Sequence, residues 1–137
     1  MTTTISDGTT TVTLSDDLLQ EDEHGWSPVQ QATTHTLTGA LWVDVSIKQA
    51  GRPITLAAGA DPDGTVYGIT TRADYARLRA MADTPGQVCT LTWRGTAYQV
   101  IWRHEDPPAL DARDLINYPD PAPDDYVLPT LKFTVIA

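Results

Sequence analysis

From Thr70 to Arg103 the chain reads TTRADYARLRAMADTPGQVCTLTWRGTAYQVIWR. The string breaks at Pro85-Gly86, a pair that ends helices and opens turns. Before the break the residues fit one amphipathic helix. After it they form two β-like runs on either side of Arg94-Gly95. Almost everything else reads as strands and polar loops, so the sequence predicts a mainly β domain with a single helix packed on it.

The helix is predicted over residues 71–82. Thr71 is a favourable N-cap, and Asp74 at the third helical position completes a pair that resembles a capping box. The apolar stripe that should face a sheet consists of Tyr75, Leu78 and Ala82, with Met81 beside it.

The two runs after the break predict a β-hairpin. Its two strands are Gln87–Trp93 and Thr96–Arg103, joined across Arg94-Gly95. On the first strand one face carries Cys89, Leu91 and Trp93, and on the second strand one face carries Tyr98, Val100 and Trp102. Cys89 is the single cysteine, so it forms no internal disulfide, and its place in the alternation indicates a buried, inert thiol.

The clearest strand signal outside this stretch is the period-two alternation of Thr36–Ile47. Its alternation predicts one long strand with one buried face, formed by Leu37, Leu41, Val43, Val45 and Ile47. Trp42 lies on the opposite, polar face, where it marks a second packed layer or a contact surface, or covers a neighbouring loop. Further strands are predicted over residues 9–14, 54–58, 66–69 and 126–136.

Two polar segments complete a single domain of residues 1–137. Residues 15–25 form an acidic loop. Residues 104–125 are rich in proline and aspartate and predict an extended loop or arm, with a short strand within 110–116.

No cluster of residues indicates catalysis or metal binding. Consecutive residues on a strand point to opposite faces, so His104-Glu105-Asp106 should not converge. Asp61-Pro-Asp-Gly64 starts like a calcium loop but lacks the later oxygen ligands, and a plain turn explains it better. Nothing fixes the geometry of Asp120, Asp124 and Asp125 around an ion. The prediction is therefore a protein that is not an enzyme, with no catalytic residue, no cofactor and no metal site.

The net charge of −9 disfavours binding to nucleic acid or to an anionic membrane surface, because both are negatively charged. No apolar run is long enough to span a bilayer, so no membrane insertion is expected. The first residues show neither a basic nor an apolar signal region, and we expect the protein to fold in the cytosol of the cell that makes it.

Three segments carry a resemblance to a known family: Gly51–Leu56, the helix end Leu78–Gly86, and the hairpin end Trp102–Asp106. Together they resemble small tail proteins from the distal end of the tail of long-tailed bacteriophages. The resemblance implies a tail-tube-like module, an antiparallel β-sandwich or split barrel with one flanking helix. It also implies a virion structural protein, assembled in the host bacterial cytoplasm, in a ring that connects the tail tube to the distal tip or baseplate.

That role implies its partners. They would be further copies of the chain in a trimer or hexamer, the tube, tip or hub and tape-measure proteins, and DNA that passes through the lumen without specific binding. Carboxylates at Asp16, Asp17, Asp61 and Asp63 would repel the phosphate backbone if they line the channel. The same acidic loops equally serve solubility and discourage edge-to-edge pairing of strands.

Two other functions remain open at this point. A receptor- or carbohydrate-binding β-module would use exposed aromatic side chains, for which Trp26, Trp42 and Tyr118 are the candidates. A hydrolase is the third alternative, and no motif supports it.

Overall fold

The computed structural model describes residues 3–116 and 118–136. Its main sheet contains nine strands in the order β2-β1-β10-β11-β13-β6-β3, with β12 and β9 both paired to β13. All these pairings are antiparallel. The strands are β1 (Thr3–Ser6), β2 (Thr11–Leu14), β3 (Leu19–Gln20), β6 (Pro53–Ala57), β9 (Thr70–Thr71), β10 (Val88–Trp93), β11 (Thr96–Trp102), β12 (Leu110–Asp114) and β13 (Tyr126–Val135). The prediction of a mainly antiparallel β domain with one flanking helix is confirmed.

Strand β13 organises this body. One of its edges pairs with β12 and then β11, and the other pairs with β9 and β6, so it is flanked along most of its length. Phe133 and Leu131 on β13 are fully buried. Phe133 packs against Trp102 of β11 with 4.5 Å between ring centroids. The face predicted for the last strand is therefore part of the core.

The helix α1 (Arg72–Ala82) begins where the sequence predicts. Thr71 is the N-cap, and its hydroxyl oxygen accepts a hydrogen bond from the Asp74 backbone N–H at 3.3 Å. Leu78 and Met81 are buried against the sheet, as the stripe predicted. At the other end, the imidazole Nε2 of His104 lies 2.8 Å from the Ala82 carbonyl oxygen, one of the carbonyls that a helix end leaves without an internal partner.

The hairpin formed by β10 and β11 turns at Arg94 and Gly95, whose φ angles are 49° and 90°. Two successive positive φ angles are characteristic of the type I′ turn, which matches the twist of the flanking strands. The Arg94 guanidinium lies 4.5 Å from the Trp93 ring and donates a hydrogen bond to the Leu18 carbonyl at 3.3 Å. These contacts stabilise Arg94 in a conformation that most side chains avoid.

Cys89 of β10 is fully buried, as predicted. Burial raises the pKa of its thiol above the ordinary value of 9.0. The side chain is therefore a neutral thiol near pH 7 and a small apolar part of the core.

The prediction for Thr36–Ile47 is wrong in two respects. The strand β5 starts only at Leu41 (Leu41–Ile47), because Thr36–Ala40 forms a turn closed by the Thr36 N–H and the Ala40 carbonyl at 2.8 Å. The face predicted to be buried is exposed along its whole length. Period-two alternation defines which side chains share a face, but it does not say whether another layer covers that face.

The partner of β5 is β4 (Val29–His35), a strand that the sequence pattern does not predict. It has a single large aliphatic residue, Val29, and therefore gives no alternation of apolar side chains. The sequence pattern also does not predict β1, whereas the strand predicted over residues 9–14 is present as β2. Besides the main sheet and the β4–β5 pair, a two-stranded sheet joins β7 (Gly59–Ala60) to β8 (Val66–Tyr67) across the predicted turn at Asp61–Gly64.

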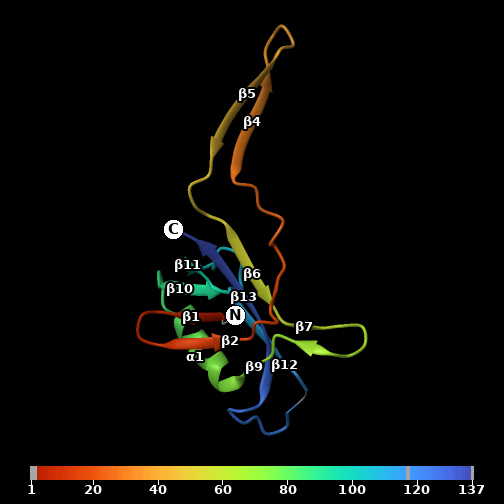
Figure 1. The fold of residues 1–137 in the computed structure, drawn as a ribbon, viewed down its shortest axis with the longest axis vertical. Helices are drawn as coiled ribbons and strands as arrows, with labels where there is room; N and C mark the ends of the chain where they lie inside the picture. Colours follow the sequence, from red (N-terminus) through yellow and green to blue (C-terminus); the bar gives the residue numbers. More distant parts are fainter. Residues whose placement is uncertain (1–2, 117, 137) are drawn as a thin grey trace.

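The molecule has an elongated outline because the β4–β5 hairpin projects from one end of the body (Figure 1). The helix α1 and the loop after β12 lie toward the opposite end (Figure 1). Residues 110–114, within the proline- and aspartate-rich segment, are held against β13 as β12, and Ala109 and Leu110 are buried. The segment that projects as an arm is therefore 29–47, and from here on we call these residues the arm.

Candidate functional site

The arm is the most unusual surface of the molecule. Every residue of β4 and β5 is exposed. Of the thirteen exposed large apolar side chains in the described residues, seven lie on the arm: Val29, Leu37, Leu41, Trp42, Val43, Val45 and Ile47. Scattered exposed apolar residues are ordinary on proteins, but a contiguous set of them marks an interaction site.

The pairing register separates two faces of the arm. Val29 lies opposite Ile47 and His35 opposite Leu41, so alternate residues share a face. One face, which we call the aliphatic face, carries Leu41, Val43, Val45 and Ile47 of β5 beside Val29, Gln31, Thr33 and His35 of β4. The other, which we call the polar face, carries Trp42, Asp44 and Ser46 beside Thr34, Ala32 and Gln30.

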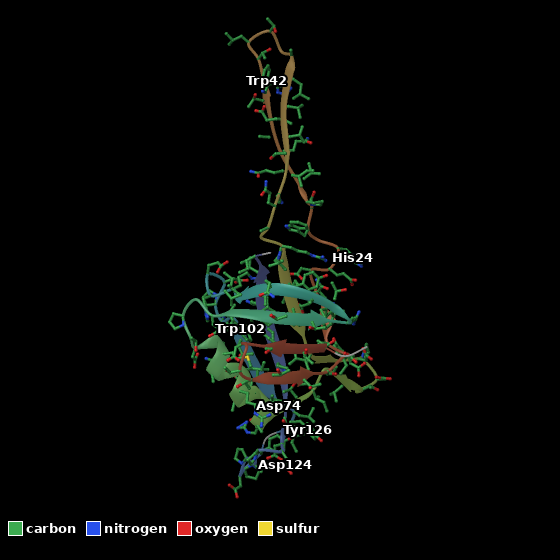
Figure 2. All side chains as sticks on the ribbon, turned by 60° about the vertical axis from the view of Figure 1, so that its left-hand side comes forward. His24, Trp42, Asp74, Trp102, Asp124 and Tyr126 are labelled. Carbon is green, nitrogen blue, oxygen red and sulfur yellow. The ribbon has the colours of Figure 1, made fainter. Side chains whose placement is uncertain are left out.

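On the polar face, the indole N–H of Trp42 donates a hydrogen bond to the Asp44 carboxylate at 3.1 Å. Trp42 remains 59% exposed. The aromatic ring is therefore held beside its own strand, near the tip of the arm (Figure 2), and it does not cover a neighbouring loop of the body.

Charge distinguishes the arm from the body. Asp44 is the only Asp, Glu, Lys or Arg residue between 29 and 47, so the arm has a formal charge of −1 and the rest of the chain −8. This contrast was visible in the sequence, because residues 25–43 contain no charged side chain in a chain that is 20% charged. A long uncharged run beside an alternating aliphatic strand is the signal that would have indicated an interface in place of a core strand.

The segment that leads into the arm is tied to the body through Asp22. Its carboxylate accepts hydrogen bonds from the Thr55 backbone N–H at 2.9 Å and the Thr55 hydroxyl at 3.0 Å. The Arg103 guanidinium donates to the same hydroxyl at 2.6 Å and has an N–O distance of 4.0 Å to the Asp22 carboxylate. Thr55 lies on β6, so these bonds fix the segment that precedes the arm to the main sheet.

At the root of the arm, where the chain enters at residue 28 and leaves at residue 48, the two chain segments contact each other. The Lys48 backbone N–H donates to the Pro28 carbonyl at 2.8 Å, and the Lys48 ammonium lies 5.6 Å from the centre of the Trp26 ring. A cation over an aromatic face is an attractive contact. Trp26 thus has a structural contact at the root of the arm.

The aromatic residues expected for a carbohydrate site do not gather. Trp26 is at the root of the arm and Trp42 lies near its tip. The Tyr118 hydroxyl oxygen accepts a hydrogen bond from the Tyr126 backbone N–H, and Tyr126 lies at the far end of the body (Figure 2). The three side chains therefore do not form one binding surface.

The candidate acid–base cluster is dispersed as well. His104 contacts the end of α1, whereas the Asp106 carboxylate lies 3.4 Å from the Lys132 ammonium. In the turn at 61–64, the Asp63 carboxylate accepts from the Thr65 backbone N–H at 3.0 Å, which lowers the pKa of Asp63. The Asp125 carboxylate accepts from the Ala122 N–H at 2.7 Å. These carboxylates stabilise turns and strand ends.

Within residues 3–116 and 118–136, no group of three His, Cys, Asp or Glu side chains is placed to hold a metal ion. The described part of the chain contains no helix long and apolar enough to cross a membrane. A hollow of about 470 Å³ lies between the start of α1 and the loop at 121–123 and is lined by Arg72, Ala73, Ala76, Pro121, Ala122 and Pro123. Arg72 is paired there with Asp114 at 2.7 Å.

No protein-family model, curated protein or solved structure matches this chain. The assignment of the arm as the candidate functional site therefore rests on its geometry and composition alone.

Proposed function

We propose that this chain is a virion structural protein of a phage tail tip and forms part of a ring that connects the tail tube to the distal tip or baseplate. The observation that carries the proposal is the uncovered aliphatic face of the arm. A single copy leaves Leu41, Val43, Val45 and Ile47 between 43% and 76% exposed. A surface of this kind belongs to a protein whose function is to assemble with neighbours.

The energetic reason follows from the size of these side chains. Burying a Val, Leu or Ile side chain fully contributes about 1.5–3 kcal/mol, so covering the exposed parts of this row contributes about 4–7 kcal/mol per copy. An isolated two-stranded hairpin is only marginally stable in water. Association with a neighbour therefore both buries the row and stabilises the arm.

The charge of the body fits the same role. A net charge of −8 outside the arm disfavours contact with the phosphate backbone of DNA that passes through the lumen. The arm, with a charge of −1, approaches other protein surfaces without that repulsion. The proposed partners are further copies of the chain in a trimer or hexamer and the adjoining tube, tip or hub and tape-measure proteins of the tail.

Sizing and imaging of the purified chain test the assembly. The full chain should form rings with a central hole in negative stain, and a variant with residues 29–47 replaced by a short Gly-Ser linker should be a folded monomer. The location in the virion is tested with an antibody against the exposed turn at 61–64, which should label the distal end of the tail. A full chain that stays monomeric at every concentration, or a label elsewhere on the particle, contradicts the proposal.

A second function is favoured by one observation, the exposed Trp42 near the tip of the arm. In a receptor- or carbohydrate-binding module this ring would stack on a sugar face or a receptor side chain. Binding on a glycan array by a stable monomer, lost in a Trp42→Ala variant, would support this function over the first.

A further inference from the structure

Both long edges of the arm present free backbone groups. The Lys48 N–H donates to Pro28 and the Thr36 N–H donates to Ala40, so the bonded pairs at the two ends of the hairpin are 28 with 48 and 36 with 40. Because bonded and non-bonded pairs alternate in an antiparallel ladder, the bonded pairs between them are 30 with 46, 32 with 44 and 34 with 42. The N–H groups of Gln31, Thr33, Val43 and Val45 therefore point away from the hairpin.

These edges lack the features that usually prevent strand pairing. Exposed edge strands are normally short, or interrupted by proline, by charged side chains or by bulges. Each arm strand has seven residues in unbroken register, without Pro, Lys or Arg. Asp44 is the single acidic residue, and its carboxylate lies on the polar face, bonded to Trp42. The edges are thus suited to pairing with another strand.

Among the described strands of a second copy, the two strands of its own arm offer the longest free edges. Outside the arm, the described strands of seven or more residues are β11 and β13. Strand β11 pairs with β10 along one edge and with β13 over Val100–Trp102 on the other, and β13 is flanked on both sides. The strands at the margins of the body, such as β2, β3 and β12, have two to five residues. Charge favours the same pairing, since the arm is nearly neutral and the body strongly acidic.

We infer that the arms of neighbouring copies pair edge to edge, with β4 of one copy hydrogen-bonded to β5 of the next. The inference rests on the self-association in the proposed function and names the surface responsible. Because β4 and β5 run in opposite directions, rotation about an axis along the arm brings β4 beside β5 antiparallel at every junction. Each arm then uses both edges, and closure of the circle leaves none open.

Hydrogen exchange at single-residue resolution on the full assembled chain tests this pairing. The amides of Ala32 and Asp44 point into the hairpin and serve as internal controls, whereas those of Thr33 and Val45 point outward. Paired arms should slow exchange at Thr33 and Val45 by about 100-fold or more relative to an unpaired amide, as at ladder positions inside a sheet. Rings in which Thr33 and Val45 exchange freely would overturn the inference and leave the proposed function standing.

A matched pair of variants supplies the second measurement. Thr33→Pro removes one outward donor and leaves the hairpin's own hydrogen bonds, whereas Thr33→Ala changes the side chain and keeps the donor. Thr33→Pro should abolish self-association and Thr33→Ala should retain it, as measured by sedimentation. Equal assembly of both variants, or equal loss, would show that the edge amide is not involved. A wild-type chain that never self-associates fails the proposed function itself, and the inference falls with it.

Discussion

Replacing Val43 and Val45 by serine removes the middle of the aliphatic face without touching the body. The two side chains are 43% and 61% exposed, so together they offer about one full valine of surface to a neighbour. Burying that surface contributes about 1.5–3 kcal/mol, which predicts self-association weaker by roughly 10- to 150-fold for each arm contact. The free energy of unfolding of the body should change by less than about 0.5 kcal/mol, because neither residue contributes to the core.

Sedimentation velocity over a concentration series measures the association, and chemical denaturation monitored by tryptophan fluorescence measures the body. Val88→Ser is the matched control, since Val88 is a β-strand valine that is 44% exposed on the body. It undergoes the same Val-to-Ser change at one position, with the same loss of strand propensity per substituted residue. If the Val88 variant weakens association as much as the arm variant, or if the arm variant associates like the wild type, the reasoning about the aliphatic face is refuted.

Three further predictions concern the body. Phe133→Ala removes a fully buried ring packed on Trp102 and should lower the free energy of unfolding by about 3–5 kcal/mol in urea denaturation; a loss below about 1 kcal/mol would show that the site collapses around the cavity. Thr71→Ala should lower the free energy of unfolding by about 1 kcal/mol and reduce the helical circular dichroism signal, because the Asp74 N–H loses its acceptor. Thr71→Ser should keep both the stability and the helical signal of the wild type, because serine supplies the same acceptor. The pKa of Cys89 is raised by burial, so the folded state keeps the proton that the unfolded state loses; stability should fall as pH rises above about 9, less steeply in Cys89→Ala, and a thiol reagent should react only on unfolding.

The sequence predicted the parts of the fold that obey local rules. The N-cap at Thr71 and the apolar stripe below it defined α1 within one residue. The pair Arg94-Gly95 defined the turn between β10 and β11, because only a few residue pairs adopt two positive φ angles. These features depend on neighbours in the chain, so the sequence alone predicts them.

The candidate site was not predictable in the same way. Alternation correctly places Leu41, Val43, Val45 and Ile47 on one face of a strand, and it predicts burial because most such faces are covered by another layer. In our proposal the layer that covers this face belongs to another copy, and no pattern within one chain describes it. The interval 25–43, free of charged side chains, was the available sign that this strand differs from those of the core.

The route by which the arm joins the body has a mechanical consequence. The chain leaves β5 at Ile47 and enters β6 six residues later, and both strands run roughly along the long axis of the molecule (Figure 1). Five residue pairs join β6 to the central strand β13. A pull on the arm would therefore act in shear, so that all five pairs must slide together before the strand detaches. Tension applied at the tip is in this way transmitted to β13 in the middle of the sheet, which pairs with four other strands.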